Sequence, residues 1–237
     1  MGSERFGSGW AQQLFQAWHK VKAGAPVKAC ARILMLVLGM GTAGFAQAQS
    51  GAELARGAEA AVDAYVSELL ETMNAARPLY DSDRPAYFAA VDEALSSFVD
   101  FREVARGVMA QYGTGPDGAT AAQLDRFADV FRSSLLDFYG SALASYGSVG
   151  YDIVPTGMED RNTPSTTNVR MNIKSSDGGR FEVQYTMFLD DQGVWKLKNL
   201  YVEGVNLRRQ YHAQFDSLMM SHNYDIDRVI DAWQVGG

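Results

Sequence analysis

The sequence predicts an α+β fold: a roughly four-stranded antiparallel sheet with about six helices packed mainly on one face, enclosing an apolar cavity. Apolar residues recur at three- and four-residue steps from residue 53 to about residue 146, whereas from Val149 onward they alternate with polar residues. The first period is that of an amphipathic helix and the second that of a half-buried strand. Helices, then a meander of strands, then helices again are typical of helices gathered on one face of an antiparallel sheet.

Two amphipathic helices are predicted before residue 100. In the first, over residues 53–76, Ala58, Val62 and Tyr65 belong to an apolar stripe with helical spacing. The second repeats this spacing after Pro85, a residue that suits the first turn of a helix. Each helix therefore has one face to bury.

Two further helices follow, and each has a recognisable start. Asp100 and Glu103 form the pattern of a capping box, which opens a short helix. The segment GTGPDGAT, residues 113–120, then interrupts the chain. Thr120 and Gln123 repeat the capping pattern, and the apolar stripe after them predicts a long helix.

The alternating segments predict a meander of about four strands. SDGG (176–179) and DDQG (190–193) are typical hairpin connections, so neighbouring strands are expected to run antiparallel. In the last strand we predict Trp195, Leu197 and Tyr201 on one side and lysines on the other. Two helices complete the fold.

These last helices begin at residues suited to capping. Asn206 and Asp225 each precede a segment with helical apolar spacing. Val205 lies directly before the first cap, where an apolar residue often packs on the fourth helical residue, here Gln210. Because Gln210 is polar, the sequence leaves two positions for Val205: it packs against the neighbouring core or, as we propose, it points toward the mouth of the cavity.

The first 48 residues have the features of a secretory signal peptide. Residues 17–32 contain four basic residues and no acidic one, an uncharged apolar run of 13 residues follows at 33–45, and Ala46 and Ala48 fit a cleavage site. A membrane anchor would need roughly 20 apolar residues. We therefore expect cleavage after Ala48 and one exported domain over residues 49–237, which has no cysteine and must be stabilised by its core.

The net charge argues against nucleic-acid binding. The chain has 21 basic and 28 acidic residues. The first 48 residues hold five of the basic and one of the acidic residues, so residues 49–237 have a net charge of −11. A protein with this charge does not attract the phosphate backbone of a nucleic acid. Basic residues gather in residues 165–212, either as a solvated face or as a docking patch. The patch would consist of Arg170, Lys174, Lys196, Lys198, Arg208 and Arg209.

Little in the sequence indicates catalysis. His212 and Asp216 share a helical face, but no second histidine is within reach by sequence spacing, so we interpret them as a surface pair rather than a metal site. No serine lies in a G-x-S-x-G motif. We predict no catalytic residue, no metal and no cofactor.

Two segments carry a resemblance to a known family. VQYTMFLDDQGVWKLKNLYVEGVNLRRQYHAQF (183–215) resembles the C-terminal signature of the MlaC (toluene-tolerance Ttg2D) family, and DFREVARGVMAQYG with AAQLDRFADVFRSSLLDFYGSALASY (100–146) resembles its helical half. The matches cover most of residues 95–222. Asn199, Asn206 and His212 stand where that family usually has Asp, Ser and Arg.

The resemblance implies a single phospholipid-binding domain over residues 49–237 that works in the Gram-negative periplasm. Its ligand would be a phospholipid, and its partners an outer-membrane lipoprotein complex and an inner-membrane ABC-type lipid transporter complex. Lipid carried between them would maintain outer-membrane lipid asymmetry.

The expected lipid-binding residues are apolar residues of the facing helix stripes and the sheet. They are Val104, Val108, Phe131, Leu135, Met171, Ile173, Val183, Tyr185, Met187, Trp195, Leu197, Val205, Tyr211 and Phe215. Apolar stripes alone do not separate a filled core from a lined pocket. The alternatives are a small enzyme with a carboxylate or Tyr in a cone-shaped cavity, an adaptor with a filled core, and a carrier of another apolar ligand.

Overall fold

The computed structural model describes residues 51–116, 118–145, 150–154, 162–163, 165–174 and 180–235. Its helices are α2 (Gly51–Ala76), α3 (Leu79–Ser82), α4 (Arg84–Phe98), α5 (Phe101–Met109), the 3-10 helix η1 (Ala110–Gly113), α6 (Ala121–Ser145), α7 (Leu207–Ser221) and α8 (Ile226–Ala232). Its strands are β1 (Gly150–Val154), β2 (Thr166–Lys174), β3 (Arg180–Leu189), β4 (Trp195–Val202) and β5 (Val205–Asn206). The predicted α+β class is confirmed, whereas the predicted signal peptide and the SDGG turn lie outside the described residues.

The predicted starts of four helices are confirmed by their caps. Asp100, Asn206 and Asp225 each accept a hydrogen bond through side-chain Oδ1 from the backbone amide three residues later, with N···O distances of 2.8, 3.0 and 3.2 Å. Thr120 and Gln123 bond reciprocally at the start of α6. These bonds satisfy amides that have no partner within the helix.

The sheet is a meander in the order β1-β2-β3-β4-β5, and all of its named strand pairs are antiparallel. The fifth strand was not predicted, and it holds only two residues. It is joined to β4 by Glu203 and Gly204, both at positive φ, the combination that a tight type I′ hairpin turn requires. This turn leads directly into the cap of α7.

A β-bulge in β4 corrects the prediction for Tyr201. Met187 pairs with Leu197 but Thr186 pairs with Asn199, so β4 contains one extra residue at this point. An extra residue reverses the alternation of side chains beyond it. Tyr201 therefore points to the opposite face from Leu197, and the apolar pattern did not reveal this.

After the bulge, two other residues take over the apolar face. Leu200 pairs with Tyr185, and Val202 pairs with Val183. Directly opposed residues of an antiparallel pair lie on one face, so Leu200 and Val202 continue the face of Leu197.

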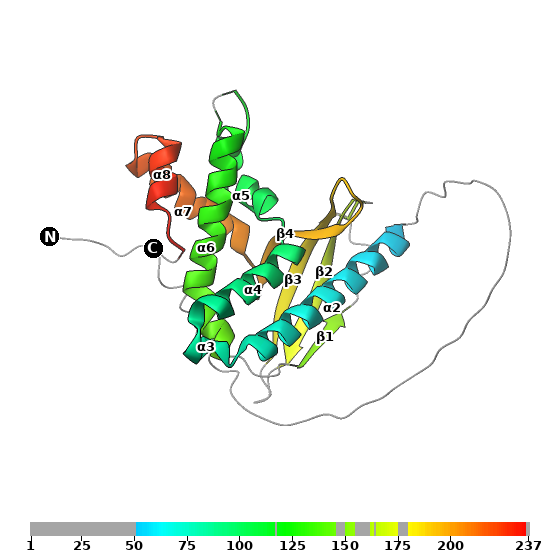
Figure 1. The fold of residues 1–237 in the computed structure, drawn as a ribbon. Coiled ribbons are helices and arrows are strands. Elements are labelled where there is room, and N and C mark those ends of the chain that lie inside the picture. Colours follow the sequence, from blue (N-terminus) through cyan, green and yellow to red (C-terminus); the bar gives the residue numbers. More distant parts are fainter. Residues whose placement is uncertain are drawn as a thin grey trace, which may run out of the picture.

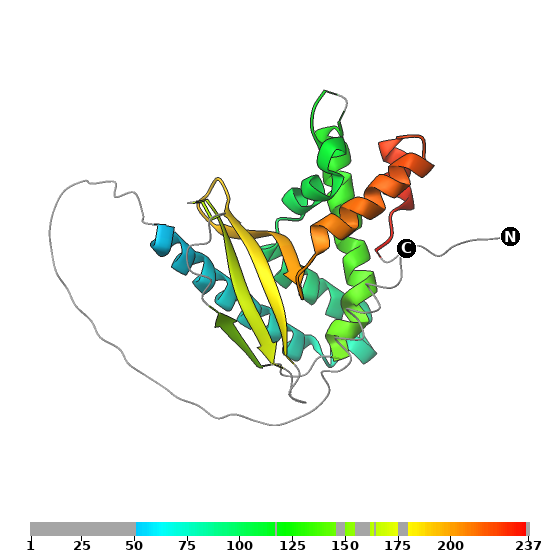
Figure 2. The same ribbon diagram turned by 180° about the vertical axis from the view of Figure 1, so that it is seen from behind.

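The elements form a sheet with helices on one face and a helical group beyond β4. Figure 1 shows α2 and α4 across the sheet and α6 beside them, whereas α7 starts next to β4 and leads away from the sheet to α8. Figure 2, from behind, shows the sheet in front of α2 and α4. No helix within the described part of the chain is long and apolar enough to cross a membrane.

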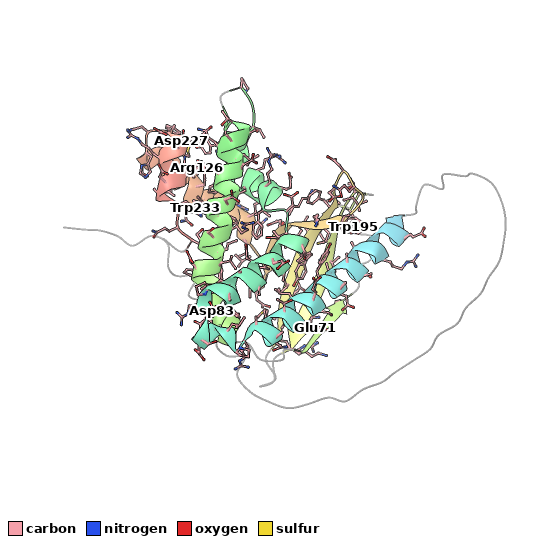
Figure 3. The ribbon with its side chains drawn as sticks, in the orientation of Figure 1. Glu71, Asp83, Arg126, Trp195, Asp227 and Trp233 are labelled. Carbon is pink, nitrogen blue, oxygen red and sulfur yellow. The ribbon has the colours of Figure 1, made fainter. Side chains whose placement is uncertain are left out.

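The buried apolar residues form three clusters. The helical cluster joins α5, α6, α7 and α8, the sheet cluster lies between α2 and strands β2–β4, and a small cluster joins the end of α2 to α4. Figure 3 shows Trp233 within the helical group and Trp195 at the sheet. On the surface of the helical group, Arg126 of α6 forms an ion pair with Asp227 of α8 at 2.9 Å.

Candidate functional site

A cavity of about 350 Å³ lies where the three clusters meet. Its walls come from α2, α4, α5, α6 and α7 and from strands β2–β4. The lining residues are Val66, Leu69, Leu95, Phe98, Val99, Phe101, Val104, Phe131, Arg132, Leu135, Leu136, Tyr139, Ile173, Phe181, Val183, Tyr185, Leu197, Asn199, Leu200, Val202, Leu207, Arg208 and Tyr211. A volume above 300 Å³ with apolar walls is typical of a small-molecule site.

The α4–α6 contact lies next to this cavity. Gly140 of α6 lies so close to Phe88 of α4 that a Cβ on the glycine would be 2.2 Å from the Phe88 ring atom Cε1. The missing side chain lets the two helices approach each other. The neighbouring residues Leu136 and Tyr139 line the cavity, so this contact positions the wall that α6 contributes.

The structure brings eight of the fourteen predicted residues together around the cavity. These are Val104, Phe131, Leu135, Ile173, Val183, Tyr185, Leu197 and Tyr211. They come from six different elements, and they are separated by as many as 107 residues along the chain. The apolar stripes therefore converge on one space.

The other six predicted residues lie outside the cavity lining. Val108 and Phe215 belong to the helical cluster, and Met171, Met187 and Trp195 belong to the sheet cluster. Val205 is half-buried in β5, where it pairs with the lining residue Val202. Buried residues of this kind support the walls from behind.

Sequence reasoning missed lining residues for two reasons. Leu69, Leu95 and Phe98 lie on the stripes of α2 and α4, so helical spacing could have found them, but it gave no sign of which stripe faces a space rather than a filled core. Leu200 and Val202 are shifted onto the cavity face by the bulge. No signal in the apolar pattern marks the bulge.

Tyrosine hydroxyls provide part of the polar lining. The hydroxyl oxygens of Tyr139 and Tyr211 lie 3.2 Å apart, and the hydroxyl of Tyr185 donates to Sδ of Met171 at 3.8 Å. Burial raises the pKa of Tyr139, and it raises the pKa of Tyr211 well above the usual value of a phenol. Both hydroxyl groups therefore keep their proton at neutral pH and are available for hydrogen bonding.

Three nitrogen-bearing side chains complete the polar lining. Arg132 forms an ion pair with Asp92 of α4, with Nε and Oδ1 3.3 Å apart. Asn199, which is buried, accepts a hydrogen bond from the backbone amide of Arg208 at 3.3 Å. Asn199 thereby ties the bulged strand β4 to the start of α7. The side chain of Arg208 also lies against the cavity.

His212 and Asp216 connect α7 to α5 and η1 through hydrogen bonds. Nδ1 of His212 lies 2.9 Å from the carbonyl oxygen of Val108, and Asp216 accepts a hydrogen bond from the Tyr112 hydroxyl at 2.6 Å. Within the described ranges no group of three or more His, Cys, Asp and Glu side chains is placed to hold a metal ion.

The residues of the proposed basic patch differ in their surroundings. The ammonium of Lys198 donates to Thr166 Oγ1 at 3.1 Å, and that of Lys196 donates to the Ser97 carbonyl. Arg208 is half-buried beside the cavity, whereas its neighbour Arg209 is exposed. The two arginines at the start of α7 therefore have different roles available to them.

The fold and the cavity define an α+β protein that encloses a mainly apolar, ligand-sized space between a sheet and helices. The chain belongs to the MlaC protein family, whose model matches residues 63–235. It is 31% identical over 173 residues to toluene tolerance protein Ttg2D of Pseudomonas putida, a match that covers 73% of this chain and 77% of that protein.

A solved structure shares the fold. It is that of a phospholipid-binding protein from Ralstonia solanacearum in complex with a phospholipid, superposed with a TM-score of 0.64. The match covers 73% of this chain and 93% of the Ralstonia chain, with 21% sequence identity. At this identity the likeness establishes a common architecture.

Proposed function

We propose that this protein is a periplasmic phospholipid carrier. It shuttles lipid between an outer-membrane lipoprotein complex and an inner-membrane ABC-type lipid transporter complex, and so maintains outer-membrane lipid asymmetry. The observation that carries the proposal is the apolar cavity of about 350 Å³ in a member of the MlaC family. The phospholipid bound in the Ralstonia protein of the same fold supports the ligand class.

The energetics of lipid transport agree with this type of wall. Two acyl chains of about 15 carbons each contribute on the order of 25 kcal/mol of apolar transfer, so carriage through water requires near-complete enclosure. Most of the side chains lining the cavity are aliphatic or aromatic. The hydroxyl groups of Tyr139 and Tyr211 form a hydrogen bond with each other. Such walls are close to a bilayer interior in polarity, which allows the lipid to leave again when a partner accepts it.

The cavity also bears on the alternatives. A filled-core adaptor does not agree with an open space between the clusters. The enzyme alternative required a carboxylate or a tyrosine inside, and three tyrosines do line the space. The hydroxyl groups of Tyr139 and Tyr211 lie within hydrogen-bond distance of each other, and burial raises the pKa of both, so a test for turnover distinguishes this alternative from the carrier.

The test is mass spectrometry of organic extracts from protein purified out of a Gram-negative periplasm. We expect phospholipid in near-stoichiometric amount. Protein with an empty cavity would contradict the carrier function, and protein loaded only with free fatty acid or a hopanoid would indicate a different apolar cargo. Phospholipid that is converted to products on incubation with the pure protein would favour the enzyme alternative.

The transfer step has its own test. Protein loaded with fluorescent phospholipid is mixed with the inner-membrane transporter complex in detergent-free nanodiscs, with empty nanodiscs as the control. We expect fluorescence to move to the complex and to stay on the protein in the control. Equal transfer to empty nanodiscs would contradict delivery to a specific partner.

A further inference from the structure

We propose that Arg208 binds the phosphate group of the phospholipid at the edge of the cavity. This inference deepens the proposed function, because it assumes that a phospholipid occupies the cavity. It assigns to one side chain the recognition of the charged part of the ligand, while the apolar walls hold the acyl chains.

Arg208 differs from the other arginine of the lining in what surrounds its charge. Arg132 is neutralised by Asp92 at 3.3 Å and approaches Asp129 at 4.0 Å. Among the residues that the structure describes, no acidic side chain forms an ion pair with Arg208, although it is half-buried against the cavity. A cation held next to an apolar space is stabilised when an anion reaches it from that space.

Close packing holds the Arg208 side chain in place. Gly107 of α5 lies directly against it, because a Cβ on Gly107 would be 2.4 Å from Arg208 Cδ and 3.3 Å from Nη1. The absent glycine side chain provides the room in which the arginine stem lies. The stem of Arg208 therefore lies between α5 and the start of α7.

A second cation, Lys198, lies near Arg208. Burial lowers the pKa of Lys198, the nearby carboxylate of Glu103 raises it, and the charge of Arg208 lowers it. Glu103 itself forms an ion pair with Arg106. Arg208 also lies in the first turn of α7, which contains no acidic residue. Because the start of a helix favours negative charge, an anion bound here would offset an otherwise unfavourable cluster.

The chemistry of the guanidinium fits a phosphate diester. Its planar N–H groups can donate two parallel hydrogen bonds to two phosphate oxygens, which a lysine cannot do. A phospholipid with its chains between the helices and the sheet has its phosphate where the apolar wall ends. Arg208 is a half-buried lining residue, and no ion pair with an acidic side chain of the described residues offsets its charge.

The test compares two ligands that differ only in the charged group. Delipidated protein is titrated with dioctanoyl phosphatidylethanolamine and with dioctanoylglycerol, which has the same chains without the phosphate. We expect Arg208→Gln to weaken phosphatidylethanolamine binding by about tenfold or more, since bonds to charged groups are of this strength. Dioctanoylglycerol binding should stay within about twofold. Arg209→Gln, one residue away and exposed, is the matched control and should change neither.

A second variant displaces the guanidinium without removing it. Gly107→Ala keeps every charge but places a Cβ where the Arg208 stem lies. We expect weaker phosphatidylethanolamine binding and unchanged dioctanoylglycerol binding, because the added Cβ displaces the arginine stem and leaves the apolar walls in place. Arg208→Lys should fall between wild type and Arg208→Gln, since it retains the charge and loses the paired hydrogen bonds.

Each other outcome contradicts the inference in a distinct way. Equal weakening of both ligands by Arg208→Gln would show a structural role, and no weakening of either would show that the phosphate lies elsewhere. Saturable binding of inorganic phosphate alone, lost in Arg208→Gln while both lipids bind equally, would assign the site to free phosphate. Wild-type protein that binds neither lipid would instead overturn the proposed carrier function.

Discussion

The two halves of helix α6 face different surroundings, although they share one apolar stripe. Phe127 is fully buried in the helical cluster, with its ring centroid 5.0 Å from that of Phe215 and 5.1 Å from that of Trp233. Two turns later Leu135 lines the cavity. Phe131, between them, belongs to both the cluster and the lining. The residue types alone do not distinguish a filled from an open environment.

The difference comes from what lies opposite each half. Opposite Phe127 lie aromatic residues of α7 and the segment after α8, whose rings meet it edge-on. Leu135 instead lines a cavity to which strands β3 and β4 contribute aliphatic side chains such as Val183 and Leu200 as well as the rings of Phe181 and Tyr185. One part of the stripe therefore packs against the rings of neighbouring helical segments, whereas the other borders a space between the helices and the sheet.

The largest loss in the free energy of unfolding is expected for substitutions in the sheet cluster, which lies behind the cavity wall. Met187 is fully buried, so Met187→Glu places a carboxylate where no water reaches it and should destabilise the protein by more than about 4 kcal/mol. Urea unfolding followed by circular dichroism measures this loss. Met187→Leu, of similar volume, should cost less than about 1.5 kcal/mol. A folded, lipid-free Met187→Glu protein would show instead that this position faces the ligand.

The next largest loss in the free energy of unfolding is expected in α6, where two alanine variants compare its two halves directly. Phe127→Ala should lower the free energy of unfolding by about 3–5 kcal/mol, because it leaves a hole among packed rings. Leu135→Ala, which enlarges a space that is already there, should cost less than about 2 kcal/mol. Equal costs in parallel urea titrations of lipid-free protein would mean that the two environments do not differ as described.

Substitutions in β4 after the bulge are expected to have a smaller effect on the free energy of unfolding but a clear effect on lipid content. Leu200→Glu puts a carboxylate into the cavity wall and should abolish co-purified phospholipid with an unfolding cost below about 2 kcal/mol. Tyr201→Glu is its matched control on the opposite face and should retain the lipid. Lipid loss in Tyr201→Glu and not in Leu200→Glu would contradict the bulge.

The smallest effect on lipid content is expected for substitutions of Val205. This residue pairs with Val202 across the β4–β5 turn, one position away from the lining. Val205→Glu should reduce the lipid content of the folded protein less than Leu200→Glu does, and Val205→Leu should leave it unchanged. Quantitative mass spectrometry of the extracts measures both. Complete lipid loss in Val205→Glu would place Val205 directly at the cavity mouth.

Much of the fold could be predicted because it depends on local physics. A capping residue such as Asn206 satisfies free amides wherever a helix starts, and a turn such as residues 190–193 reverses a strand within its own sequence. The periods of 3.6 and 2 follow from backbone geometry. These features need no knowledge of distant residues, so the helices, the meander and the family resemblance could be recognised from the sequence.

The cavity could be predicted only in part, because its walls are set by residues far apart in the chain. The bulge that turns Leu200 inward follows from the pairing of β4 with β3, and the position of Arg208 depends on Gly107, about 100 residues earlier. The sequence by itself determined which faces are apolar, where elements begin and that the domain has no cysteine. The tertiary structure alone decided which apolar faces fill a core and which border a space, because that depends on the size and distance of the side chains opposite them.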